Sequence, residues 1–274
     1  MQPARPPTWL VYPALVLALL ILALSQRTHA DAPAPPPALP ATEGAVLAQT
    51  TPFDVLSVTR VRRRFGGETG TAFSVGDGGV WLAGGELASD CPHAALLVGA
   101  GQGVVAKADP ALGLLAVLTT PGGAPALPLA AAEPRPGSLA YVAGFPHGRP
   151  GEVALRLLGR ETLTLRARSD PRAPVLVWAE IGRTETLAGP LSGLAGAPVL
   201  DGEGRVVGVV VGEAPRRGRL YATTLQAVTQ ALAAAKVNTA TGAAGQPITA
   251  DNYGLAADDL RRSFRVTPTV CARG

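Results

Sequence analysis

Few side chains in this sequence could act as a nucleophile or as a general base. Histidine is the usual base that activates a serine or a cysteine, and the chain contains only three: His29, His93 and His147. The first lies in a predicted export segment, and we expect the other two to lie in solvent-facing turns. Ser192 precedes the glycine-rich stretch GLAGAPVLD at 193–201, and we interpret it as an ordinary loop serine. None of these residues forms an evident catalytic pair.

The two cysteines, Cys91 and Cys271, do not have the spacing of metal ligands. In an exported domain we expect one disulfide that fixes the C-terminal tail to the first half of the chain. Closing so long a loop stabilises a fold by on the order of 5 kcal/mol in the chain-entropy model. Two unrelated buried thiols are the alternative, and a nucleophilic Cys91 would need a free thiol with a base beside it. We predict no metal site and no cofactor.

The composition indicates a globular fold with many turns. Hydrophobic residues make up 47% and charged residues 16%, and 33 glycines and 26 prolines favour short strands over long helices. The net charge is +4, with arginines gathered at 60–64 and at 216–219. Because no aromatic residues are interleaved with either cluster, we interpret them as a strand edge and a charged turn. We therefore predict no nucleic-acid partner.

Residues 1–30 are predicted to send the rest of the chain across a membrane. The run at 9–24 contains 16 residues without a charge, which is long for a signal-peptide core and short for a membrane span. Small residues at Thr28 and Ala30 would suit cleavage, so a signal anchor and a signal peptide both remain open. Residues 31–45, rich in proline and alanine, are predicted to be a linker.

Short apolar runs cut by glycine follow from Val46 onward, at a spacing of roughly 8–12 residues that is typical of all-β folds. The strands expected in the first half are 55–61, 71–75, 79–82, 94–98, 103–106 and 114–118. Residues 121–128 read as a linker. The strands expected in the second half are 138–144, 152–158, 161–167, 175–179, 197–200, 206–212 and 220–223. The pattern favours two small barrels, although a β-sandwich would fit it nearly as well.

The last part of the chain is predicted to contain two helices and a strand. Leu225, Val228 and Leu232 share one face of a helix at 224–236. A second helix is expected at 251–264, and a closing strand at 265–270 ends at Cys271. We place the barrels at 46–236 and a C-terminal tail at 237–274.

Four motifs occur in a family-specific order. GTAFSVGDGGVWLAGGELASDC at 70–91 is similar to a Gly-Thr-x-Phe strand followed by a strand that leads into Thr-Ala-x-His-Val-Val. ADPALGLLAVL at 108–118 is similar to an Asp-Leu-Ala-x-Leu strand, and GFPHGRPG at 144–151 to a Gly-Tyr-Pro turn. GLAGAPVLDGEGRVVGVVVG at 193–212 is similar to a Gly-x-Ser-Gly-x-Pro loop and its following hairpin. Together the motifs resemble the trypsin-like serine endopeptidases of the bacterial envelope, over about residues 54–232.

The resemblance implies an all-β fold of two six-stranded antiparallel β-barrels, with C-terminal helices and an N-terminal hydrophobic helix. It also implies where a catalytic triad should lie. The family histidine falls at Glu86, the aspartate at Gly113 or Leu114, and the serine at Ala195. Serine supplies the attacking oxygen, histidine carries its proton, and aspartate fixes the histidine tautomer. Alanine has no oxygen for the attack, and loss of a triad costs about a million-fold in turnover.

The resemblance leaves a scaffold that could still bind a peptide. The backbone N–H groups of Gly193 and Ala195 could form the remnant of an oxyanion hole. The segment 178–193 would line the specificity pocket, and the strand edge at 209–213 could add a peptide as an extra strand. Glu86 would place a negative charge in the cleft, which would favour basic peptides.

We therefore expect an inactive protease homologue that binds peptides or proteins at the bacterial inner membrane facing the periplasm, or in the periplasm itself. Membrane contact would come through the N-terminal segment. An active endopeptidase with differently placed catalytic residues is the alternative. A third possibility is a structural envelope protein whose barrels only support the C-terminal tail.

Overall fold

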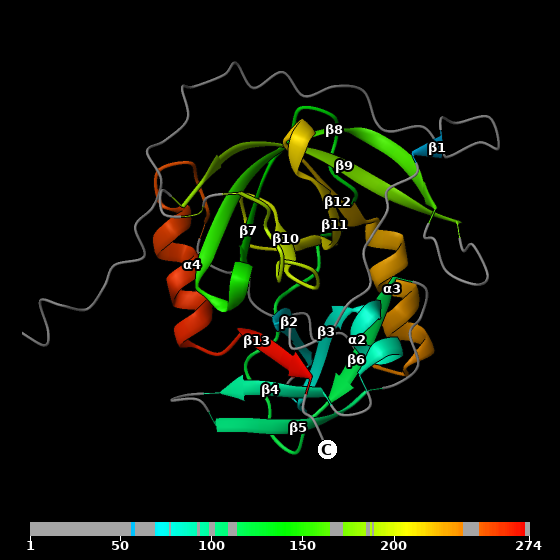
Figure 1. Cartoon of the computed structure of the whole chain (residues 1–274), viewed down its shortest axis with the longest axis vertical. Coiled ribbons are helices and arrows are strands. Elements are labelled where there is room, and N and C mark those ends of the chain that lie inside the picture. The colour runs from blue at the N-terminus through cyan, green and yellow to red at the C-terminus, as the bar shows by residue number, and fades with distance from the viewer. Residues whose placement is uncertain are drawn as a thin grey trace, which may run out of the picture.

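Two closed antiparallel β-barrels, each of six strands, make up the protein (Figure 1). The computed structural model describes residues 56–57, 69–76, 78–91, 94–98, 102–108, 114–164, 172–184, 187, 189–237 and 247–271. The predicted N-terminal hydrophobic helix, the Pro/Ala linker, His29, His93 and Gly113 lie outside these residues. Within them, no helix is both long enough and apolar enough to span a membrane.

The first barrel takes five strands from the N-terminal half and its sixth from the C-terminus. Its strands are β2 (Thr69–Gly76), β3 (Val80–Gly84), β4 (Ala94–Val98), β5 (Gln102–Ala108), β6 (Leu115–Thr119) and β13 (Val266–Cys271). Strand β13 pairs with β2 on one side and with β4 on the other, which closes the barrel. The strand that we expected in a separate tail is therefore a member of the first barrel.

The second barrel consists of consecutive strands that follow the linker. They are β7 (Leu139–Gly144), β8 (Gly151–Thr164), β9 (Arg172–Arg183), β10 (Pro198–Leu200), β11 (Val206–Ala214) and β12 (Arg219–Thr223). Two of the predicted strands, at 152–158 and 161–167, are the single strand β8. A bulge between Leu157 and Gly159 keeps its ladder with β9 continuous across the glycine. The two-residue β1 (Leu56–Ser57) pairs in parallel with β8, so it extends the second barrel.

Among the described residues, three helices and two short 3₁₀ turns complete the fold. They are α2 (Gly85–Asp90), η1 (Pro146–Gly148), η2 (Pro215–Arg217), α3 (Leu225–Ala234) and α4 (Tyr253–Arg262). The sequence pattern did not predict α2. Thr224 caps α3, because its side chain accepts a hydrogen bond from the N–H of Ala227.

Alternating side chains let each strand of the first barrel serve two cores. On β3, Trp81 and Ala83 point into the first barrel, whereas Leu82 joins a core shared by both barrels. Phe73 of β2 also enters this shared core, together with Val209 of β11 and residues of α3 and α4. Because a strand alternates its side chains between two faces, the barrels pack directly against each other. This contact fixes how the two barrels lie against each other.

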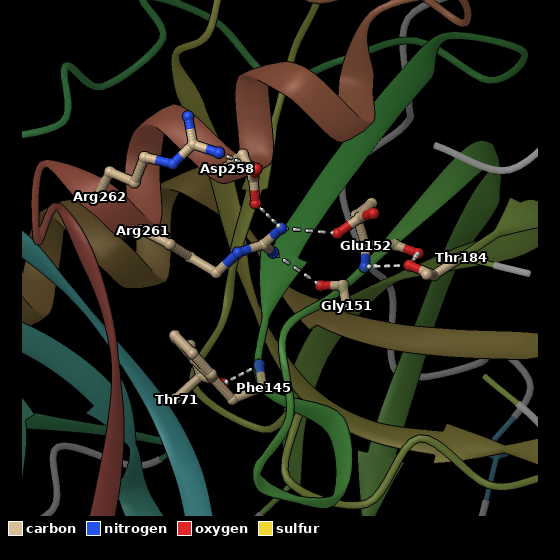
Figure 2. Close-up of polar contacts among 8 residues, drawn as sticks. All are labelled: Thr71, Phe145, Gly151, Glu152, Thr184, Asp258, Arg261 and Arg262. Carbon is tan, nitrogen blue, oxygen red and sulfur yellow. Dashed lines mark hydrogen bonds and ion pairs between the residues drawn. The ribbon is translucent and has the colours of Figure 1, made fainter. Parts of the chain in front are cut away.

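The C-terminal segment is held to both barrels by polar and covalent bonds. In α4, Nη2 of Arg261 lies 3.0 Å from Oε2 of Glu152 on β8 and 3.1 Å from Oδ1 of Asp258 (Figure 2). Arg261 is 9% exposed and Glu152 is 1% exposed, so this ion pair lies inside the protein. At the other end, Cys271 forms a disulfide with Cys91, with Cα atoms 5.5 Å apart. The predicted disulfide is therefore confirmed.

Candidate active site

The loop 191–197 forms a tight turn where the second barrel meets the first. The N–H of Leu194 donates to the carbonyl of Leu191 at 3.0 Å, and Gly193 has a φ of 94°. A turn closed in this way, with a positive φ at its third residue, is of type II. Gly196 also has a positive φ, of 88°. A Cβ at Gly196 would lie 2.1 Å from the carbonyl oxygen of Thr71, so only glycine fits at this position.

The carbonyl groups of this turn are bound to neighbouring elements. The carbonyl of Ser192 accepts from the N–H of His147 at 2.5 Å. Thr71 binds two more carbonyl groups of the loop. Its Oγ1 donates to the carbonyl of Gly193 at 2.9 Å, and its N–H donates to the carbonyl of Ala195 at 3.0 Å. In contrast, the N–H groups of Gly193 and Ala195 have no acceptor among the residues that the structure describes.

This arrangement leaves a pair of free backbone donors two residues apart. A trans peptide directs its C=O and N–H to opposite sides. The bond from His147 to the carbonyl of Ser192 therefore turns the N–H of Gly193 away from His147, and the bond from the N–H of Ala197 to the carbonyl of Leu194, at 2.9 Å, turns the N–H of Ala195 away from Ala197. Two such donors suit a carbonyl oxygen or an oxyanion of a ligand. The same two N–H groups are the ones that the motif at 193–198 predicts for an oxyanion-hole remnant, and that role stays a prediction.

The end of β3 and the start of α2 lie against the same turn. A Cβ at Gly84 would be 3.7 Å from the Cβ of Ala195, so the two backbones are in contact. The N–H of Gly85 donates to the carbonyl of Leu114 at 2.8 Å. Glu86 follows in the first turn of α2 and is half-buried. The three backbone segments that carry Glu86, Leu114 and Ala195 therefore meet in the cleft.

The environment of Leu114 is apolar. Its half-buried side chain packs against a cluster formed by Leu163, Val175, Val177, Val211 and Tyr221. A carboxylate in this apolar cluster would be costly unless it had a partner.

The backbone of Gly189 and Leu191, at the start of this loop, is held by charged side chains that the motifs did not indicate. Arg183 forms an ion pair with Glu180, and its Nη1 donates to the carbonyl of Gly189 at 2.8 Å. The hydrogen bond and charge of Glu180 raise the pKa of Arg183. Oε2 of Glu213, on β11, accepts from the N–H of Leu191 at 2.7 Å. Burial raises the pKa of Glu213, although the bond from Leu191 and the charge of Arg183 oppose this.

The remaining candidates lie apart from any catalytic pair. The side chain of Ser192 is exposed. Cys91 is oxidised in the disulfide, so it has no thiol. His147 contacts the loop rather than Ser192 Oγ, since its Nε2 lies 2.6 Å from the carbonyl oxygen of Pro190. Within the described residues, no group of three or more His, Cys, Asp or Glu side chains could hold a metal ion.

The profile of the trypsin-like peptidase domain matches residues 70–209, from β2 to the first part of β11, and this range includes the turn. The chain belongs to the trypsin-like peptidase family. The recognition of this family from the motifs is therefore confirmed, together with the double-barrel fold. No curated protein matches the sequence.

Solved structures of trypsin-like proteases share the fold at low sequence identity. Rv3671c from M. tuberculosis H37Rv, a serine-to-alanine mutant in its inactive form, is 20% identical with a TM-score of 0.50, over 61% of this chain and 84% of that chain. The active form of the same protease is 18% identical with a TM-score of 0.48, over 75% and 98%. The HtrA-type protease AlgW with a decapeptide is 14% identical with a TM-score of 0.47, over 60% and 50%.

Thr71 and Gly84 of the first barrel meet Ala195 at the contact between the two barrels. The Gly-Thr-x-Phe motif at 70–73 was a signal for Thr71, but we interpreted it only as a strand. Its hydroxyl also accepts from the N–H of Phe145 at 3.1 Å, which joins the strand to the second barrel (Figure 2).

Proposed function

We propose that this chain is a catalytically inactive trypsin-like protease homologue of the bacterial envelope, and that it binds peptide segments in the cleft. One observation carries the proposal: Ala195 supplies one of the two backbone donors that have no acceptor among the described residues, and its methyl group offers no oxygen for attack on a carbonyl. Glu86 and Leu114 lie on the segments that meet this turn, and neither is a histidine or an aspartate. The scaffold for binding a carbonyl thus remains, without side chains for acyl transfer.

The edge of β11 supports the binding of an extended peptide. Strand β10 pairs with β11 only as far as Pro198 opposite Val209, whereas β11 continues to Ala214. Beyond Val210, β11 pairs with β12 and has no strand on its other side among the described residues. A peptide could add as a strand there, with one carbonyl directed to Gly193 and Ala195.

Charge in the cleft favours basic ligands. Glu86 stands in the first turn of α2, and Glu213 and Glu180 lie on the wall formed by β11 and β9. Arg183 offsets one of these negative charges. We expect Glu86→Ala to weaken the binding of peptides rich in lysine and arginine, and Glu203→Ala, in an exposed turn, to serve as the charge control. Unchanged binding by Glu86→Ala would remove the preference for basic peptides from the proposal.

The test of inactivity is incubation of the full chain with a pool of unfolded envelope proteins. New peptide termini are then identified by mass spectrometry over time. We expect no time-dependent cleavage, followed by recovery of bound peptides from the chain. Cleavage by the wild type that persists in Ser192→Ala would reveal a nucleophile elsewhere. Cleavage lost in Ser192→Ala would show that Ala195 does not occupy the catalytic position, and both results would favour an active endopeptidase.

A further inference from the structure

His147 adopts a backbone conformation that disfavours any residue with a Cβ. Its φ is 52° and its ψ is 27°, in the left-handed region, and Gly148 follows with a φ of 73°. Strained backbone of this kind persists where surrounding contacts require it, and it marks positions with a special role. The contacts of His147 identify what requires the conformation.

Two hydrogen bonds join His147 to the carbonyl groups of Pro190 and Ser192. Its backbone N–H donates to the carbonyl of Ser192 at 2.5 Å. Its ring Nε2 lies 2.6 Å from the carbonyl oxygen of Pro190. Because a carbonyl oxygen only accepts, the ring carries its hydrogen on Nε2. The left-handed conformation lets one residue bond both acceptors, which flank Leu191.

The bond to Ser192 controls one of the two free donors. The carbonyl of Ser192 and the N–H of Gly193 belong to the same peptide, so they point in opposite directions. If this peptide rotated, the type II turn would become a type I turn, in which Gly193 would have a negative φ. The carbonyl of Ser192 would then enter the site, and the N–H of Gly193 would leave it.

No other described anchor holds this peptide. Thr71 binds the carbonyls of Gly193 and Ala195. Glu213 binds the N–H of Leu191, and Arg183 binds the carbonyl of Gly189. We infer that His147 is a positioning residue that keeps the N–H of Gly193 turned toward the ligand site. This inference rests on the proposed function for the identity of the ligand, but the orientation of the peptide can be measured without one.

The experiment observes the peptide between Ser192 and Gly193 directly. The sequence contains a single Ser-Gly pair, at 192–193. A full chain made in a cell-free system with ¹³C-carbonyl serine and ¹⁵N-glycine therefore gives one carbonyl-to-amide NMR signal. His147→Gly removes the ring and the strain, whereas His147→Gln keeps a terminal N–H donor in place of Nε2. Lys236→Gly is the matched control, because Lys236 has a φ of 55° and lies outside the site.

We expect His147→Gly to move both the serine carbonyl and the glycine amide shifts. Without the ring bond to Pro190, the backbone at position 147 is no longer fixed, so its N–H releases the carbonyl of Ser192 and the turn changes type. His147→Gln and Lys236→Gly should keep the wild-type signal. Peptide capture from the pool of unfolded envelope proteins should fall roughly tenfold in His147→Gly, the value of about one hydrogen bond. An unchanged signal in His147→Gly, with wild-type thermal stability, would overturn the positioning role. If the wild type captures no peptide, the proposed function is wrong, while the signal still decides the role of His147.

Discussion

Thr71 is the residue that joins the two barrels at the cleft. It is fully buried, and its hydroxyl both donates to the carbonyl of Gly193 and accepts from the N–H of Phe145. Its own N–H donates to the carbonyl of Ala195. A hydroxyl can do both because it has one donor and two lone pairs. Valine has a similar shape but would leave these buried groups unpaired.

Gly196 is the residue at which a side chain would do most damage to the turn. We expect Gly196→Ala to lower the free energy of unfolding by about 3 kcal/mol or more, since it combines a positive φ with backbone contact. Gly218→Ala is the control, because Gly218 also has a positive φ but no atom within 4 Å of its added Cβ. It should cost about 1 kcal/mol. Urea denaturation measures both, and equal losses would contradict the role of contact with Thr71.

Glu213 should make stability depend on pH. Burial raises its folded-state pKa above the ordinary value of 4.5. A group shifted in this direction contributes stability below its unfolded pKa, and this contribution is lost as the pH rises through the folded pKa. We therefore expect the unfolding free energy of Glu213→Gln to fall less than that of the wild type as the pH rises from about 4.5 toward neutrality. Urea denaturation at a series of pH values tests this, and parallel profiles would contradict it.

At the scale of elements, α4 is fixed to β8 by a buried ion pair. Arg261 contacts Glu152, Asp258 and the carbonyl of Gly151 (Figure 2). Burial raises the pKa of Glu152 more strongly than Arg261 lowers it. The pair is therefore costly to desolvate, and its value lies in fixing where α4 docks and thus where β13 begins.

A double-mutant cycle tests this pair. Arg261→Met should cost about 3–5 kcal/mol, because it leaves the Glu152 carboxylate buried without its cation. Replacing both residues, as Arg261→Met with Glu152→Leu, should restore part of the loss. The control is Arg262→Met, which breaks a more exposed pair with Asp258 and should cost less than about 1 kcal/mol. Additive effects of the two single substitutions would show that the pair is not coupled.

At the scale of the whole molecule, a strand from the C-terminal part of the chain completes the barrel formed by the N-terminal half. The first barrel forms only when β13, at the C-terminus, inserts between β2 and β4. The disulfide then fixes the end of β13 to Cys91, at the end of α2. We therefore expect the two barrels to unfold as one cooperative unit, in which the C-terminal segment is required.

Ending the chain after Lys236 should therefore prevent folding. The truncated chain lacks α4 and β13, which leaves the edges of β2 and β4 unpaired and prone to aggregate. We expect no cooperative unfolding transition by circular dichroism. A Cys91→Ser, Cys271→Ser double variant separates the strand from the cross-link, since it should still fold, with a loss of up to about 5 kcal/mol. A folded truncated chain would show that the first barrel closes without β13.

Local patterns were sufficient for most strands and insufficient for two features. Strand β4 has the predicted bounds, because five apolar residues stand between turn-forming segments. In contrast, α2 has only six residues and no side-chain cap, so it has too few residues for a helical period. The sequence pattern divided β8 into two strands because glycine is typical of a strand end, and Gly159 lies between the two halves. In the structure, β8 pairs with β9 on both sides of Gly159, so the strand is continuous.

The sequence by itself determined the family and the position of most strands. These follow from motif spacing and alternation, which are local properties of the chain. Only the tertiary structure decided that β13 completes the first barrel, that Thr71 binds the turn and that His147 holds Ser192. Each of these contacts joins residues at least 45 positions apart. Such pairing depends on how the barrels pack, and no local pattern records it.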